Sequence, residues 1–262
     1  MTGRIQAAFQ PGRTALFPYL TAGFPDAIAS GELIQAMIEA GADGLEIGVP
    51  FSDPMADGLT LQRANERALE HGASILSALH LASFARQVSP SVAISFMSYC
   101  NPILSYGEQA FCEAAAQAGV DGLIVPDLPP EESGALRAAC RQAGLEYICF
   151  LSPNSTAERI RLVAGMAGGF IYCVALVGVT GARTDLKDSL PPFLERVRAA
   201  TDVPLVVGFG ISSPEHVRAL NGLADGVIVA SALADLIDSS PPQERAAAVA
   251  QRIRELKAAA AG

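Results

Sequence analysis

The sequence is built on one repeated pattern: a helical stretch, then a glycine, then a short run of apolar and β-branched residues. Three copies are closely similar, namely GADGLEI at residues 41–47, GVDGLIV at 119–125 and ADGVIV at 224–229. The glycine can adopt the left-handed conformation that ends a helix, and the apolar run is short enough for a strand buried on both faces. Further runs of this kind lie at residues 15–20, 92–97, 146–151, 170–174 and 205–208. The pattern therefore predicts eight buried strands.

Helices are expected between these strands, and two of them have readable starts. Residues 154–156 (Asn-Ser-Thr) offer a capping residue, and Pro214 after Ser213 suits the first position of a helix. Strands that alternate with helices favour an α/β fold: a single-domain (β/α)8 TIM barrel over residues 1–262, with extra short helices. Residues 74–87 resemble such an insertion. The alternative is an open doubly wound sheet, which is disfavoured because TAGFP, not GxGxxG, follows the first strand.

Composition excludes several classes of protein. Half of the 262 residues are hydrophobic, which allows a large core and excludes intrinsic disorder. The net charge of −9 would repel phosphate backbones, so nucleic-acid binding is disfavoured. We expect neither a signal peptide nor a membrane span, since no window is apolar for long enough. The five cysteines are scattered, with no CxxC pair, which fits reduced thiols in the cytoplasm.

The scarcity of lysine and histidine narrows the chemistry. The two lysines, Lys187 and Lys257, lie outside the predicted strands, so a Schiff-base aldolase has no nucleophile. The three histidines fall in helical stretches and form no metal-binding pattern. We therefore expect no metal site, and a reaction that depends on carboxylates, hydroxyls and backbone amides.

Glu46 is the most informative single residue. It interrupts the apolar strand LEIGV, where a buried carboxylate is costly unless it is paired or protonated. Burial raises a carboxyl pKa toward neutrality, which suits a group that gives and takes a proton. The structural alternative is an ion pair with an arginine of a covering helix. Because buried glutamates are rare, the functional interpretation is favoured.

Other candidates lie where the predicted strands end, because active sites of such barrels lie at that end. Asp57 could accept a hydrogen bond from a substrate N–H, although an aspartate in a loop rich in proline and glycine is more often a turn residue. Tyr172 is more often a core residue, and Phe209 between two glycines suits a pocket floor. Asp127 is interpreted as a cap of the next helix rather than as a catalytic group.

Small residues at the last two strand ends suggest a phosphate site without basic side chains. Gly181, Gly210, Ala230 and Ser231 place backbone N–H groups where they can converge, and a helix is expected to begin near Ser231. Glycines at such positions also serve close packing, so this signal is moderate in specificity.

These motifs together resemble one known family. With Glu46, the run PFSDPMADG at residues 50–58 and GVTGAR at 178–183, the chain is similar to tryptophan synthase alpha subunits. The resemblance extends from PYLTAG at residues 18–23, through GFGI at 208–211, to ASA at 230–232. It implies a carbon–carbon lyase that cleaves indole-3-glycerol phosphate to indole and glyceraldehyde 3-phosphate.

The resemblance also implies residue roles. Glu46 matches the acid/base, and Asp57 matches the carboxylate that holds the indole N–H. The indole slot is matched by Tyr19, Met97, Tyr99, Ile124, Tyr172 and Phe209, and the phosphate site by Gly181, Gly210, Ala230 and Ser231. The chain departs from the family pattern in having Ala230 where glycine is usual and Phe24 where aspartate is frequent.

Partner and cofactor are implied in the same way. The resemblance implies an α2β2 complex with a pyridoxal-phosphate-dependent beta subunit, no cofactor in this chain, and passage of indole through a tunnel. Residues 50–58 and 177–190 would serve as lids that exclude water. Related barrels that need catalytic lysines or a Cys/Asp pair at strands 1 and 5 fit poorly, because strand 1 ends in Tyr19 and Thr21. An inactive barrel that only regulates a beta partner has no physical need for Glu46 and Asp57.

Overall fold

Eight parallel strands close into a barrel in chain order in the computed structural model, which describes residues 3–175, 186–208 and 210–261. The strands are β1 (Ala15–Thr21), β2 (Gly44–Gly48), β3 (Ala93–Met97), β4 (Gly122–Ile124), β5 (Glu146–Leu151), β6 (Ile171–Val174), β7 (Leu205–Gly208) and β8 (Gly226–Val229). Pairing of β1 with β8 closes the ring and excludes the open sheet. All eight strands predicted from the repeated pattern are confirmed.

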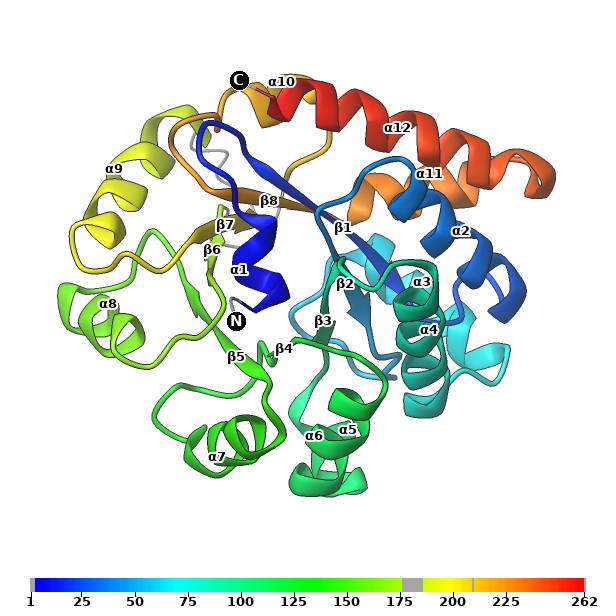
Figure 1. The fold of residues 1–262 in the computed structure, drawn as a ribbon, viewed down its shortest axis with the longest axis horizontal. Coiled ribbons are helices and arrows are strands. Elements are labelled where there is room, and N and C mark those ends of the chain that lie inside the picture. Colours follow the sequence, from blue (N-terminus) through cyan, green and yellow to red (C-terminus); the bar gives the residue numbers. More distant parts are fainter. Residues whose placement is uncertain (1–2, 176–185, 209, 262) are drawn as a thin grey trace.

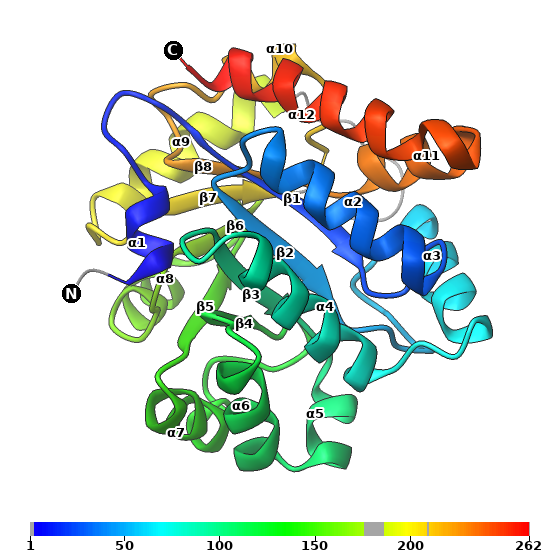
Figure 2. The ribbon, with the colours of Figure 1, turned by 45° about the vertical axis from the view of Figure 1, so that its right-hand side comes forward.

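Helices surround the barrel, as Figure 1 shows. They are α1 (Arg4–Ala8), α2 (Ala27–Glu39), α3 (Leu59–Glu70), α4 (Ile75–Val88), α5 (Cys100–Tyr106), α6 (Glu108–Gln117), α7 (Gly134–Ala143), α8 (Ala157–Ala164), α9 (Leu186–Arg198), α10 (Pro214–Arg218), α11 (Ser231–Ser239) and α12 (Arg245–Ala260), with a 3-10 turn at Pro242–Glu244. The last helix, α12, lies beside α2 and α11 (Figure 2). None of the described helices is long and apolar enough to cross a bilayer.

The helix starts follow the local sequence in two predicted places. The Thr156 side chain accepts a hydrogen bond from the Arg159 N–H and caps α8. Ser213 caps α10 in the same way through the His216 N–H, with Pro214 at the first helical position.

The prediction of an inserted helix at residues 74–87 was wrong. Two helices join β2 to β3, and α4, which covers that segment, packs on α2 and β2 as an ordinary covering helix of the barrel. The added helix is α3, which contacts β1 and α11 instead. The physical reason is the buried face: α4 buries a wide stripe of alanine and leucine, whereas most of α3 is polar.

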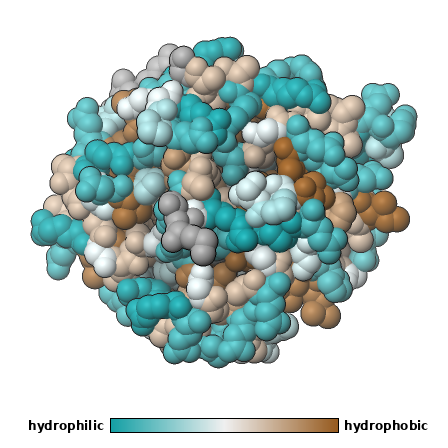
Figure 3. All heavy atoms as spheres, in the orientation of Figure 1, coloured by the Kyte–Doolittle hydropathy of each residue, from teal (hydrophilic) through white to brown (hydrophobic). Residues whose placement is uncertain are grey.

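The two ends of the barrel differ. At the amino end, α1 lies across the mouth (Figure 1), and the rings of Phe9, Phe17 and Phe170 pack with centroids 5.6–6.2 Å apart. Ile5 of α1 is buried against this end. On the face where α1 lies, hydrophilic side chains cover most of the surface (Figure 3). The packing closes this end and leaves the other end to hold a site.

Candidate active site

Glu46 and Asp57 lie together at the carboxyl end of the barrel. Glu46 stands in the middle of β2, with Leu45 and Ile47 on the opposite side of the strand as its period of two requires. Its neighbours in register are Tyr19 of β1 and Ser95 of β3. Asp57 lies near the end of the loop that follows β2, one residue before Gly58, the N-cap of α3. Their side chains are buried, with exposed fractions of 1% for Glu46 and 5% for Asp57.

The Glu46 carboxyl group lacks the ionic partner that a structural glutamate would need. Its Oε2 atom is fully buried and has no hydrogen-bond partner among the described residues. No arginine or lysine in the described part of the chain forms an ion pair with it, so the structural alternative is not supported. Burial first, and the nearby Asp57 second, raise the pKa of Glu46 to about 8. The group is therefore mostly protonated at neutral pH.

Asp57 is buried less severely and is better supplied with hydrogen bonds. Burial raises its pKa to about 6, while hydrogen bonds from Tyr99 and Asn65 act in the opposite direction. The Asn65 amide lies 3.3 Å from Asp57 Oδ2. At neutral pH, one carboxyl group of the pair is thus mostly protonated and the other mostly charged.

Two glycines make room for tyrosines beside this pair. A methyl group at Gly48 would overlap the hydroxyl of Tyr19, and one at Gly208 would overlap the hydroxyl of Tyr172. Both tyrosine rings are buried, and the Tyr172 ring packs on Phe150 with centroids 4.8 Å apart. Burial raises the pKa of both tyrosines, so both hydroxyls stay protonated and can donate hydrogen bonds.

A cavity of about 850 Å³ opens above these groups. Of the residues predicted to form the site, it is lined by Tyr19, Glu46, Asp57, Met97, Tyr172, Gly210, Ala230 and Ser231. Tyr99 and Ile124 are buried but are not among its lining residues. Gly181 and Phe209 lie outside the described residues, as does most of the second predicted lid.

The start of a helix also lines the cavity. Ala230 is the N-cap of α11, Ser231 is its first residue, and both line the cavity with Gly210. The first N–H groups of a helix have no partner within it and suit an anion. Ala230 has a φ of −117°, which any residue can adopt, so its backbone conformation does not require the glycine usual in the family.

The other departure from the family pattern, Phe24, fills a buried position. Its ring is 4% exposed and faces the Arg67 guanidinium at 5.8 Å from the centroid. The Phe24 N–H donates to the Thr21 carbonyl oxygen at 3.0 Å. This departure therefore has a local packing role in the loop after β1.

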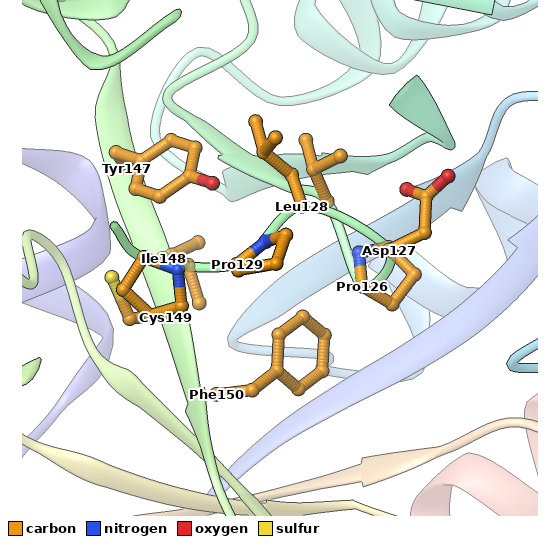
Figure 4. A pocket seen from close by; sticks show the side chains of 10 residues that line it. Pro126, Asp127, Leu128, Pro129, Tyr147, Ile148, Cys149 and Phe150 are labelled. Carbon is orange, nitrogen blue, oxygen red and sulfur yellow. The ribbon is translucent and has the colours of Figure 1, made fainter. Parts of the chain in front are cut away.

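Next to the main cavity lies a smaller pocket of about 170 Å³, shown in Figure 4. Pro129, Phe150 and Pro126 line both the main cavity and this pocket.

Asp127 points its carboxylate away from Phe150 (Figure 4) and accepts a hydrogen bond from the Cys100 N–H at 2.9 Å. The prediction that Asp127 caps the next helix was wrong: it caps α5, which follows the neighbouring strand β3 and begins at Cys100. The ends of the adjacent strands β3 and β4 lie side by side at this rim, so a residue that follows β4 can cap the helix that follows β3.

Sequence reasoning missed Asn65. From the sequence, an asparagine inside a helix is expected to be a surface residue without a special role. The Asn65 side chain is instead buried and contacts Asp57. Its spacing of eight residues from Asp57 was the available signal, once α3 is known to begin just after the loop.

Within the described residues, no group of three or more His, Cys, Asp or Glu side chains could hold a metal ion.

Comparison with known proteins gives a consistent result. The family model described as Tryptophan synthase alpha chain matches residues 5–261. A tryptophan synthase alpha chain from a Roseiflexus species is 51% identical over 246 residues, 94% of each chain. Tryptophan synthase subunit alpha from Legionella pneumophila matches with a TM-score of 0.89 and 34% identity, covering 99% of this chain and 98% of that one. A tryptophan synthase structure from Mycobacterium tuberculosis matches with a TM-score of 0.90 and 35% sequence identity, covering 99% of this chain and 97% of that one. The similarity spans the whole barrel rather than one motif.

Proposed function

The chain belongs to the tryptophan synthase alpha chain family, and we propose that Glu46 and Asp57 carry out the reaction of that family here. The reaction is the retro-aldol cleavage of indole-3-glycerol phosphate to indole and glyceraldehyde 3-phosphate, the first half of the last step of tryptophan biosynthesis. The single observation that carries the assignment of residues is the Glu46 carboxyl group. It is buried, lines the cavity, has an Oε2 atom without a partner among the described residues, and has a pKa near 8.

Glu46 is proposed to transfer two different protons, one in each of two steps. In its protonated form it gives the proton to C3 of the indole ring, which produces an indolenine cation. As a carboxylate it then takes the proton of the hydroxyl group on the adjacent glycerol carbon. The carbon–carbon bond breaks, its electron pair returns to the ring, and the hydroxyl carbon becomes the aldehyde. Glu46 ends protonated, so the cycle needs no outside acid or base.

Asp57 is proposed to stabilise the charge that this proton transfer creates. Its carboxylate would accept the indole N–H, which becomes more acidic and more positive when C3 is protonated. A pKa near 6 leaves Asp57 mostly charged at neutral pH. In a buried site, a fixed anion beside a developing cation has a larger effect than it would in water.

The remaining predicted residues are proposed to hold the substrate. Tyr19, Met97 and Tyr172 line the same cavity as Glu46 and suit the flat apolar indole ring. Gly210, Ala230 and Ser231 suit the phosphate, because backbone N–H groups can bind it without basic side chains. We keep the same roles for Gly181 and Phe209, and the indole-side role for Tyr99 and Ile124, on the resemblance alone.

The family works with a beta subunit, and we propose an α2β2 complex that receives indole from this chain. The carboxyl-end rim supports a partner at this position, because Met55, Leu59 and Leu104 are 84%, 77% and 57% exposed there. We propose that this chain uses no cofactor, since proton transfer suffices for its step, and that pyridoxal phosphate belongs to beta. Five free cysteines support a cytoplasmic location, where thiols stay reduced.

Indole release by the purified chain, with and without a beta subunit, tests these roles. We expect E46Q to lower kcat by about 10³-fold and D57N by about 10²-fold, because proton transfer and charge stabilisation are each lost. A matched control is E146Q, which makes the same change at the amino end of β5, where Glu146 accepts from Gln6. Retained turnover in E46Q would refute its role. A wild-type chain inactive in both conditions would favour a purely regulatory barrel.

A further inference from the structure

Asn65 ties the loop after β2 to helix α3 and to Asp57 at the same time. Its Oδ1 accepts from the Phe51 N–H at 3.1 Å, and its Nδ2 donates to the Leu61 carbonyl oxygen at 2.9 Å and to Asp57 Oδ2 at 3.3 Å. The side chain is 3% exposed. These three hydrogen bonds hold the buried side-chain amide of Asn65 in a single orientation.

The orientation of this amide is fixed by two backbone groups. The Phe51 N–H can only donate and the Leu61 carbonyl oxygen can only accept, so the oxygen of Asn65 must face Phe51 and its NH2 must face Leu61. The second N–H of that NH2 group is then directed at Asp57. The network therefore presents a donor to the carboxylate whatever the charge of Asp57.

Tyr99 supplies a second donor from another element. Its hydroxyl oxygen accepts from the Ala56 N–H at 3.1 Å, and its hydroxyl proton is donated to the Asp57 carboxylate. Its ring packs on Phe51 with centroids 5.4 Å apart. Asp57 is thus held between α3 and the end of β3.

The surroundings of Asp57 make these two donors important. The titratable groups that face it are Glu46 of β2, Tyr19 of β1, Tyr172 of β6 and Tyr99, all acids. No cation in the described part of the chain forms an ion pair with Asp57. Hydrogen bonds from Asn65 and Tyr99 are the interactions that lower its pKa against the effect of burial.

We propose that Asn65 and Tyr99 are positioning residues of the cleavage reaction, which aim the Asp57 carboxylate at the cavity and keep it charged for the indole N–H. This inference rests on the proposed role of Asp57. It gives Asn65 an effect on the reaction that passes through Asp57 rather than through contact with the substrate, and it gives Tyr99 such an effect in addition to the indole-side role kept above.

The test compares N65L with Q62L. Leucine has the same branched shape and number of side-chain heavy atoms as asparagine, although it is larger, and it makes no hydrogen bond. Gln62 is the matched control, because it lies on the same helix and donates to the Asp57 backbone carbonyl oxygen at 2.8 Å, not to the carboxylate. The first measurement is the pH titration of the Asp57 side-chain carboxyl carbon by NMR in the free chain. We expect the midpoint to rise by about one pH unit in N65L and to stay at the wild-type value in Q62L.

The second measurement is kcat/KM for indole-3-glycerol phosphate as a function of pH. We expect N65L to lose about fivefold at pH 6, where a one-unit rise lowers the charged fraction of Asp57 from about one half to about one tenth, and clearly less at pH 8, because the carboxylate returns as the pH rises. A loss that is equal at both pH values, or an unchanged Asp57 titration, would overturn the proposal. A merely structural tie would lower kcat/KM or stability without moving either pH dependence.

Y99F keeps the test decisive if N65L does not fold. It removes the second donor and keeps the ring that packs on Phe51, and we expect the Asp57 midpoint to rise in the same direction. The result for D57N separates the two levels of inference. If D57N keeps full activity, the proposed role of Asp57 fails. If D57N is inactive but Asp57 titrates normally in both N65L and Y99F, only the positioning role fails.

Discussion

Carboxylates stand at both ends of this barrel, and the two ends use them in opposite ways. At the amino end, Asp43, Asp121 and Asp225 each directly precede a strand and are paired with cations. At the carboxyl end, Glu46 and Asp57 are buried without an ion-paired cation in the described part of the chain. The same chemical group stabilises the fold where its charge is satisfied and is available for chemistry where it is not.

The amino-end aspartates share one geometry. Each one accepts a hydrogen bond from the N–H of a residue in the preceding strand of the ring, and its own N–H donates to the carbonyl oxygen of that same residue. The distances from the strand backbone N to the aspartate Oδ2 are 2.8 Å for Leu16 and Asp43, 2.9 Å for Ile94 and Asp121, and 2.7 Å for Leu205 and Asp225. The return bonds measure 3.0, 2.7 and 2.9 Å in the same order. We call these three residues the amino-end clamps.

The clamps differ in burial and in partners. Asp43 is 6% exposed and pairs with Arg13 and Lys257. Asp121 is 11% exposed and pairs with Arg4 and Arg86, whereas Asp225 is 36% exposed and pairs with Arg198. Because ion pairs contribute more when they are shielded from water, the clamps should form a graded series.

The largest expected effect is the loss of stability in D43N. We expect a decrease of about 3 kcal/mol in the free energy of unfolding, because Arg13 and Lys257 would be left facing each other without the carboxylate. Urea unfolding measures this change. Turnover per folded molecule should stay within about twofold of wild type, since the clamp lies at the other end of the barrel. A large loss of turnover with normal stability would show that the two ends do not divide these tasks.

The opposite change is expected for E46Q. The pKa of Glu46 is raised from 4.5 to about 8, so the folded state disfavours the carboxylate. The wild-type protein therefore loses stability from this group as the pH rises from 4.5 through 8, and E46Q escapes that loss. The full shift corresponds to about 5 kcal/mol, but the buried glutamine amide would lack partners as well. We therefore expect E46Q to be more stable by about 2 kcal/mol at pH 9 and nearly equal to wild type at pH 4. If E46Q is less stable at pH 9, the burial of an uncompensated carboxyl group is the wrong explanation.

The pH dependence of turnover should report the unpaired carboxyl groups as a pair. Activity needs Asp57 charged and Glu46 protonated, so kcat/KM should fall below about pH 6 and above about pH 8. One pH unit beyond either limit should cost about tenfold. Stopped indole-release assays from pH 5 to 9 measure the profile, with the D43N variant as a control for general unfolding. A flat profile over this range would contradict both assignments.

The smallest effect is expected at the most exposed clamp. D225N should lower the free energy of unfolding by about 1 kcal/mol, because Arg198 is itself 41% exposed and regains water. Together with D43N and D121N, it tests whether the cost follows burial. Equal costs in all three variants would mean that the shared backbone bonds, not the ion pairs, carry the stability of the clamps.

Sequence patterns predicted the fold because its causes are local. Short apolar runs, most of them preceded by a glycine at a helix end, defined the strands, and the alternation of strands with helices favoured the barrel. The helical spacing of the two segments did not identify α3, the more polar of the two, as the added helix. Which of the two helices covers the barrel as a regular layer helix is decided by the tertiary contacts that each one makes. The Asp127 cap was missed for a related reason: its partner Cys100 lies in another connection.

For the candidate site, the sequence alone determined that a carboxyl group stands inside a buried strand, since an acidic residue in LEIGV is visible without coordinates. It also contained the three copies of the clamp aspartate. Tertiary structure decided what each acid does. Whether a carboxylate meets arginine, a backbone N–H, an asparagine or an empty cavity depends on residues far away in the chain, and those neighbours set its pKa and its use.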